Sequence, residues 1–235
     1  MTETVLPQGT DKVRAVDRMF DAIAPRYDLL NRILTFGMDV RWRKLAVRSL
    51  GLATESVILD IGCGTGDLCR VLSAGGYRAV GIDRSAGMLA GAKGPRSGGA
   101  ALVRGDGTCL AVADDSVDGI VSGFTLRNLV SLVPFLDECA RAVRPGGRIA
   151  LLEVSTPGHP ALRAGHAAYF GHVVPFVGGL LSDRAAYSYL PQSVAYLPGD
   201  DELVAMIAAA GFPDARRQAL SAGIAQLIIG TRAQA

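Results

Sequence analysis

Short uninterrupted hydrophobic runs alternate along the chain with segments whose hydrophobic positions recur at helical spacing. The runs cover residues 57–61, 79–83, 100–104, 119–124 and 148–154. Runs of this length bounded by glycine are typical of strands buried on both faces of a parallel sheet. Helical segments lie between them, at 68–74, 85–93 and 131–143. The alternation therefore predicts an α/β fold with five parallel strands and right-handed crossovers.

Both ends of the chain depart from this alternation. A helical stripe over 12–26, which Pro25 ends or bends, precedes a second helix over 39–50. Asp39 is the expected N-cap of that second helix and Gly51 its terminator. After a helix at 200–210, two strands at 215–220 and 224–231 are joined by Ser221-Ala222-Gly223. This tail predicts a C-terminal antiparallel hairpin.

Composition places the chain among globular proteins. Of its 235 residues, 49% are hydrophobic and 20% are charged, enough for one domain with a well-formed core. A net charge of +2 without a basic run argues against a nucleic-acid partner. The four cysteines have neither C-x-x-C spacing nor accompanying histidines, so we expect reduced thiols and no metal. The polar start and the lack of a long apolar run predict a cytoplasmic protein.

The first predicted strand leads directly into a glycine-rich turn. Residues 57–67 read VILDIGCGTGD, so Asp60 ends the hydrophobic run and Gly62, Gly64 and Gly66 follow at alternate positions. Glycine lets the chain turn sharply into a helix and lets a ligand approach the backbone. A strand, a tight loop and a helix N-terminus form the arrangement with which α/β sheets bind nucleotide-like cofactors.

The spacing of the glycines distinguishes two kinds of cofactor. A dinucleotide site requires G-x-G-x-x-G, whereas this chain has D-x-G-x-G-x-G. Asp60 and Asp67 would repel a pyrophosphate and favour a ligand with a cation or an amine. The pattern resembles motif I of class I methyltransferases, which implies S-adenosylmethionine, a sulfonium with a free amino group. Asp83 ends the next strand, where its carboxylate can accept both ribose hydroxyls.

A further acid follows the third strand, in Gly105-Asp106-Gly107. In methyltransferases an acid at this place receives the adenine amino group, and a small neighbour lets the ring lie against the backbone. The resemblance therefore implies adenine contacts for Asp106 and Gly107. Asp is also common in glycine-rich turns for a purely structural reason, because its side chain hydrogen-bonds the backbone of the turn.

Two helical regions flank the predicted cofactor site. We expect residues 12–50 to lie over it as a lid, the alternative being that they only pack on the sheet. The segment 155–199 is too long for a connector, and its middle, 167–181, is almost wholly apolar. Its histidines lack metal-ligand spacing. It is compatible with a pocket wall for a hydrophobic substrate, a homodimer interface or a contact with the membrane surface.

Four segments outside motif I are more specific. They are YDLLN at 27–31, FTLRN at 124–128, LEVS at 152–155 and YSYLPQS at 187–193. In order and spacing, over nearly the whole chain, they resemble the ubiquinone/menaquinone biosynthesis C-methyltransferases. The resemblance implies one class I methyltransferase domain over residues 1–235, with a Rossmann-like doubly wound sheet, an N-terminal helical lid and a helical insertion after the fifth strand.

The resemblance also implies an activity, the S-adenosylmethionine-dependent C-methylation of a prenylated quinol ring, with 2-demethylmenaquinol as the expected acceptor. Residue by residue, Thr65, Asp83, Asp106 and Gly107 fall on cofactor positions of the family. Gly123 falls where many members have Ser, which removes a hydroxyl near the cofactor.

Two other departures lie near the expected substrate mouth. Asp39 stands where the family often has His, and Thr125 replaces a Gly before Leu-Arg-Asn. They bear on the identity of the acceptor more than on the reaction. Two alternatives therefore stay open: C- or O-methylation of a small aromatic or polyketide acceptor, and a non-catalytic quinone-binding protein.

Methylation of a ring carbon requires a nucleophilic carbon, which a hydroquinone supplies once a ring hydroxyl loses its proton. Arg127 and Asn128, just after the fourth strand, are candidates for holding the ring oxygen or its activating water. Because arginine stays protonated, its role would be to stabilise the phenolate. Alternatively, Arg127 only pairs with an acid such as Asp39. Tyr27, Asp39 and Tyr187 are the further candidates for the substrate pocket.

Overall fold

Seven strands form one sheet in the order β3-β2-β1-β4-β5-β7-β6 in the computed structural model, which describes residues 8–181, 189 and 192–234. The strands are β1 (Val57–Ile61), β2 (Arg78–Asp83), β3 (Ala101–Arg104), β4 (Val117–Gly123), β5 (Val143–Val154), β6 (Arg216–Leu220) and β7 (Ala225–Thr231). Strands β1 to β5 pair in parallel, whereas β7 runs antiparallel to both β5 and β6. The predicted sheet, with its C-terminal hairpin, is confirmed.

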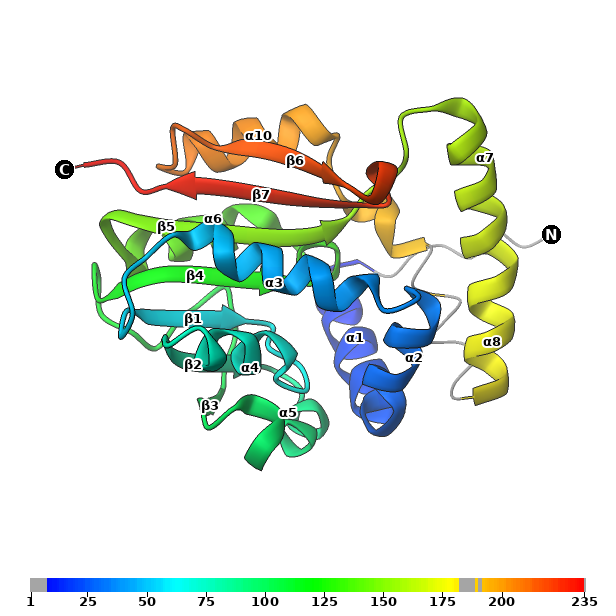
Figure 1. The fold of residues 1–235 in the computed structure, drawn as a ribbon, viewed down its shortest axis with the longest axis horizontal. Coiled ribbons are helices and arrows are strands. Elements are labelled where there is room, and N and C mark those ends of the chain that lie inside the picture. Colours follow the sequence, from blue (N-terminus) through cyan, green and yellow to red (C-terminus); the bar gives the residue numbers. More distant parts are fainter. Residues whose placement is uncertain (1–7, 182–188, 190–191, 235) are drawn as a thin grey trace.

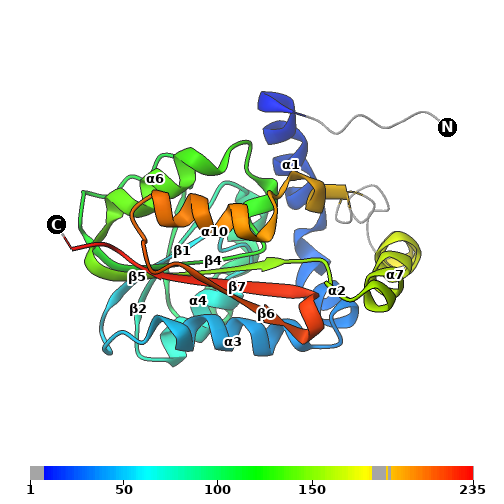
Figure 2. The same cartoon turned by 90° about the horizontal axis from the view of Figure 1, so that it is seen from above.

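Helices cover both faces of this sheet (Figures 1 and 2). Helices α3 (Met38–Leu50) and α4 (Asp67–Ala74) lie on one face, and α6 (Leu132–Ala142) and α10 (Asp200–Ala209) on the other. In β5, Ile149 and Leu151 pack towards α6 while Ala150 and Leu152 pack towards α3, and all four are fully buried. Burial on both faces explains why the strands read as continuous hydrophobic runs.

The predicted N-cap of α3 is wrong. The helix begins at Met38, after Gly37 in the left-handed conformation (φ 72°), so Asp39 lies inside the first turn. The Asp39 carboxylate is 1% exposed and accepts hydrogen bonds from the Thr35 hydroxyl (2.9 Å) and the Arg43 guanidinium. It therefore serves a buried ion pair and not a cap. Gly51 ends the helix as predicted, with a φ of 60°.

Local sequence explains two further boundaries. Ser85 caps α5 (Ala86–Ala92), since its hydroxyl accepts the Met88 N–H at 3.0 Å. The segment from Arg144 to Gly147 lies within β5 as an irregularity, where the register with β4 shifts. Gly146 has a φ of 78° there, which favours glycine.

The remaining helices gather where β1, β4 and β5 end (Figure 1). They are α1 (Gly9–Ile23) and α2 (Tyr27–Leu34) from the N-terminal region, and α7 (Pro160–Ala168) and α8 (Val174–Leu181) from the segment after β5. Pro25 lies in a short 3-10 turn between α1 and α2, and a π-helical segment, Tyr169–Val173, joins α7 to α8. Ile23, Leu30, Met88 and Val174 form a small shared core that holds these helices together.

Polar contacts tie the N-terminal helices to the body of the protein. Arg32 of α2 pairs with Asp67 at 3.0 Å, and the Thr65 hydroxyl donates to the Asp28 carboxylate. Asp21 of α1 accepts the Ser85 hydroxyl at 2.5 Å. Helices α1 and α2 are therefore attached directly to the loops that follow β1 and β2.

Lys12 provides a separate attachment for α1. It is 2% exposed, and its ammonium donates to the Leu129 carbonyl at 2.5 Å and lies 3.4 Å from the centre of the Tyr196 ring. Burial lowers the pKa of Lys12 to about 8. Leu129 directly follows Arg127-Asn128, so this contact connects α1 to the candidate catalytic turn. None of the helices in the described ranges is long and apolar enough to cross a membrane.

Candidate active site

Two cavities meet where the strands end. The first, here the strand-end cavity, has a volume of about 360 Å³ and lies against the loops after β1, β2, β3 and β4. The second, here the helical cavity, has a volume of about 370 Å³ and lies among α2, α3 and α7. Tyr27 and Phe124 line both, so these two aromatic rings stand at the junction.

Glycines shape the strand-end cavity for different reasons. Gly64 has a φ of 54°, and a Cβ there would meet no atom within 4 Å, so its backbone lies open. Gly62 has a φ of 73°, and a Cβ there would lie 2.2 Å from Thr125 Oγ1. A Cβ on Gly107 would lie 2.6 Å from Ile61 Cγ2, which keeps this loop close to β1. All three glycines line the cavity.

Asp83 is held in a fixed position at the same wall. Its Oδ2 accepts the Gly64 N–H at 2.7 Å and its Oδ1 accepts the Ser85 N–H at 2.8 Å. Burial raises the pKa of Asp83 above its ordinary value. Each carboxylate oxygen keeps a further lone pair, so the group can accept two neighbouring hydroxyls of a ligand.

Asp106 lines the strand-end cavity and is linked to α1. It accepts hydrogen bonds from the Thr108 N–H (2.9 Å) and hydroxyl (2.7 Å), and it pairs with Arg84 at 2.5 Å. Arg84 pairs in turn with Asp17 of α1 at 3.1 Å. An exposed ion-pair chain therefore joins α1 to the predicted adenine position.

Three residues that the sequence assigned to the cofactor line neither cavity. They are Asp60, Thr65 and Gly66. Asp60 is fully buried within β1, its Oδ2 accepts the Cys69 thiol at 3.3 Å, and its Oδ1 has no hydrogen-bond partner in the described chain. Burial raises the pKa of Asp60 to about 7. The Thr65 hydroxyl donates to Asp28 of α2, and Gly66 packs against Ser97. These residues therefore support the loop from the side that faces away from the cavities.

Two departures from the family pattern lie at the end of β4 and just after it. Gly123 and Thr125 both line the strand-end cavity, and Thr125 packs against Gly62. The expectation that Thr125 lies near the substrate mouth stays a prediction. Asp39 lines the helical cavity, and Tyr187 lies outside the described residues.

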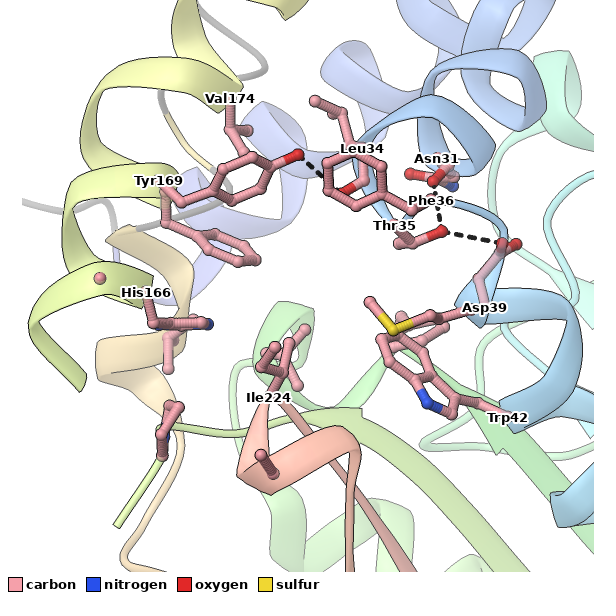
Figure 3. A pocket seen from close by; sticks show the side chains of 18 of the residues that line it. Asn31, Leu34, Thr35, Phe36, Asp39, Trp42, His166, Tyr169, Val174 and Ile224 are labelled. Carbon is pink, nitrogen blue, oxygen red and sulfur yellow. Dashed lines mark hydrogen bonds between the residues drawn. The ribbon is translucent and has the colours of Figure 1, made fainter. Parts of the chain in front are cut away.

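The helical cavity is bordered mainly by apolar and aromatic side chains (Figure 3). They include Leu34, Phe36, Met38, Trp42, Phe124, Leu162, Tyr169, Phe170, Val174 and Ile224. Most of the polar groups here are already bonded: Asp39 to Thr35 and Arg43, and the Tyr169 hydroxyl to the Leu34 carbonyl at 2.9 Å. Such a space suits a hydrophobic ligand.

Arg127 and Asn128 stand at the junction of the cavities, in the short 3-10 turn Leu126–Asn128. Arg127 lines the helical cavity and Asn128 the strand-end cavity. Arg127 is 5% exposed and pairs with the fully buried Glu153 at the end of β5, so it does pair with an acid, as the alternative interpretation held, but the acid is Glu153 and not Asp39. Asn128 donates to the Phe124 carbonyl at 3.2 Å, while its Oδ1 is buried without a partner in the described chain.

Sequence reasoning overlooked Phe124 and Glu153. Phe124 has a φ of 61°, unusual for a bulky residue, and this conformation aims the chain from β4 into the Leu126–Asn128 turn. Glu153 could have been identified as a lone acid near the end of a hydrophobic strand, the same signal that identified Asp60 and Asp83. No signal in the sequence indicated that it pairs with Arg127.

The family model described as the ubiE/COQ5 methyltransferase family matches residues 8–232. The chain belongs to this family. "Ubiquinone/menaquinone biosynthesis C-methyltransferase UbiE" of Syntrophotalea carbinolica is 42% identical over 91% of this chain and 92% of its own. "Demethylmenaquinone methyltransferase" of Roseiflexus sp. is 41% identical over 99% of both chains, and that of Thermus thermophilus is 41% identical over 91% and 100%.

Solved structures show the same fold at low identity. The putative methyltransferase bound to the Haloferax volcanii Trm112 activator has a TM-score of 0.67 at 18% identity, over 92% of this chain and 98% of that one. The [4+2]-cyclase SpnF has a TM-score of 0.69 at 16% identity, over 98% of both chains. A fold shared with a cyclase does not by itself decide the reaction.

The buried carboxyl of Asp60 makes stability depend on pH. Between its ordinary pKa of 3.8 and its folded-state pKa of about 7, the folded protein holds one more proton than the unfolded chain. Stability therefore falls as pH rises through this window, by up to roughly 1.4 kcal/mol per pH unit. Asp60→Asn cannot ionise, so its stability relative to wild type should rise with pH, as measured by urea unfolding. Asp114→Asn, at an exposed carboxylate, is the control, and an Asp60→Asn curve parallel to wild type would contradict the assignment.

Proposed function

We propose that this protein transfers a methyl group from S-adenosylmethionine, bound in the strand-end cavity, to a ring carbon of a prenylated quinol in the helical cavity. The observation that carries the proposal is the junction itself: a cavity with a fixed carboxylate meets an apolar cavity at Tyr27 and Phe124. The names of the Roseiflexus and Thermus relatives support 2-demethylmenaquinol as the acceptor.

The residues of the strand-end cavity fit the cofactor. The open backbone at Gly64 leaves room for a ligand beside the loop, and the two oxygens of Asp83 suit a pair of ribose hydroxyls. Asp106 and Gly107 line the part assigned to the adenine. Helix α1 contributes Val13, Val16 and Phe20 to the same cavity, which supports its role as a lid. When bound, S-adenosylmethionine supplies an electrophilic methyl group.

Arg127 and Asn128 supply what the acceptor requires. The ring carbon becomes nucleophilic when an adjacent hydroxyl loses its proton, which places negative charge on oxygen in an apolar cavity. Arg127, permanently charged and held by Glu153, stabilises that phenolate. The unpartnered Oδ1 of Asn128 accepts a hydrogen bond from the ring hydroxyl, or from the water that removes its proton. The surrounding helices exclude water from the transfer.

The reaction is tested by incubating the protein with labelled S-adenosylmethionine and chemically reduced demethylmenaquinone, followed by mass analysis. We expect one labelled methyl group on the ring of the product. Asp83→Ala removes both carboxylate oxygens, so affinity for S-adenosylhomocysteine, measured by calorimetry, should fall roughly tenfold or more. Methylation of simple phenols but not of the quinol would favour the small-aromatic alternative. If wild type binds neither S-adenosylmethionine nor S-adenosylhomocysteine, the non-catalytic quinone-binding alternative is favoured.

Asn128→Ala and Arg127→Lys should lower kcat by roughly 100-fold while the KM for S-adenosylmethionine changes little. The loss follows because these groups act on charge that develops during the reaction. Arg144→Lys is the matched control, since Arg144 pairs with Asp118 in an exposed position away from both cavities. Near-normal turnover of both site variants would remove these residues from the mechanism.

We also propose that the helices around the helical cavity contact the membrane surface. Exposed apolar side chains gather on α2, its following turn and α7–α8: Leu29, Ile33, Phe36, Leu162, Val173 and Phe176. Phe36 and Leu162 belong at the same time to the lining of the helical cavity, so the exposed patch is continuous with the space assigned to a lipid acceptor. This continuity favours a bilayer over a second copy of the chain.

Leu29→Ser combined with Phe176→Ser should weaken sedimentation with phospholipid vesicles without changing turnover of a short-chain acceptor. Both side chains are exposed, by 62% and 72%, and neither lines a cavity. Val133→Ser, at an exposed apolar residue on α6, is the control. Unchanged vesicle binding, together with a loss of dimers in sedimentation velocity, would assign the patch to a homodimer interface instead.

A further inference from the structure

His166 carries an unused hydrogen-bonding atom in the helical cavity. Its Nε2 is buried and has no hydrogen-bond partner in the described part of the chain, and among the described residues that line this cavity it is the only side chain with such an atom. A buried polar atom without a partner costs roughly 1–3 kcal/mol, so natural proteins rarely keep one without a ligand or water to satisfy it.

The imidazole is oriented towards the ligand space. It packs on Phe170 with ring centres 4.3 Å apart and planes inclined by 31°. Figure 3 shows it pointing into the cavity from α7, across from Asp39 and Trp42. Burial lowers the pKa of His166, so the ring is neutral at pH 7. A neutral imidazole has one N–H and one lone pair, and either can pair with a hydroxyl.

The other polar groups around this space are engaged within the protein. Asp39 accepts from Thr35 and Arg43, and the Trp42 indole donates to the Ser221 hydroxyl at 3.0 Å. The Tyr169 hydroxyl donates to a backbone carbonyl. A ligand group that needs a hydrogen bond on the α7 side of the cavity therefore meets His166.

A para-dihydroxy ring presents such a group. Its two oxygens lie at opposite ends of the ring, so when one is held at Arg127 and Asn128 the other points away from the cofactor. We propose that His166 binds this second ring hydroxyl through Nε2 and thereby selects hydroquinones over monophenols. The inference rests on the proposed function, because it assumes that the acceptor ring lies in the helical cavity.

Trp42, the only tryptophan of the chain, lines the same cavity and reports binding directly. Quenching of its fluorescence gives affinities for two matched ligands under reducing conditions. One is a prenylated 1,4-dihydroxynaphthalene, and the other is the corresponding prenylated 1-naphthol, which keeps the hydroxyl beside the carbon to be methylated. Wild type should bind the dihydroxy ligand roughly tenfold more tightly, the effect of about one hydrogen bond in an apolar site.

His166→Leu should bind both ligands with equal affinity, whereas His166→Gln, which keeps a polar side chain, should retain part of the preference. Leu162→Ala is the matched control, because Leu162 lies one turn earlier on α7 and lines the same cavity. Leu162→Ala should weaken the binding of both ligands by the same factor and leave the ratio of their affinities unchanged. S-adenosylhomocysteine binding checks that each variant is folded.

Two results would overturn the role of His166 while leaving the proposed function in place. One is equal affinity of wild type for the two ligands when both are methylated. The other is an unchanged preference in folded His166→Leu. If neither ligand quenches Trp42 nor is methylated by wild type, the proposed function itself fails.

Discussion

The parallel pairing of β1 with β2 is the constraint on which the site depends. It brings the ends of two buried strands together, with Ile61 opposite Ile82. The ladder continues into the glycine loop, because the N–H groups of Gly62 and Cys63 both donate to the Ile82 carbonyl, at 2.8 and 3.1 Å. Asp83 then closes the loop through Gly64. Without this pairing, the loop would have no fixed position relative to the carboxylate.

A second constraint governs the boundary between the two cavities. The buried pair of Arg127 and Glu153 joins the turn after β4 to the end of β5. Burying two charges is costly even when they are paired, and a hydrophobic pair of similar size often serves stability equally well. A guanidinium fixed beside an apolar cavity is, however, what a phenolate requires. The free-energy cost of burying this pair is therefore consistent with a role for Arg127 in catalysis, with Glu153 holding the guanidinium in place.

Fold and function separate clearly in this protein. The sheet and its helices match structures as different in activity as a putative methyltransferase and a [4+2]-cyclase. The features that bear on function lie at the strand ends: the apolar cavity among α2, α3 and α7, and two polar atoms, Asn128 Oδ1 and His166 Nε2, that are buried without a partner in the described chain. Helix α2, which lines the helical cavity, is attached to the loop after β1 through Asp28 and Arg32, so this loop and the helical cavity are mechanically linked.

The hydrophobic pattern alone predicted the sheet, because strands buried on both faces must be continuous hydrophobic runs and glycines mark the turns that require positive φ. It also identified Asp83 and the Gly62–Gly64 loop, since parallel strands place their carboxyl ends at one edge. The packing of the elements decides which charges meet across the fold. Arg127 with Glu153, and Arg32 with Asp67, join segments whose distance in space no local pattern encodes. The same holds for Asp60, which lies behind the loop, and for His166, whose unpaired nitrogen follows from the packing of α7 across the strand ends.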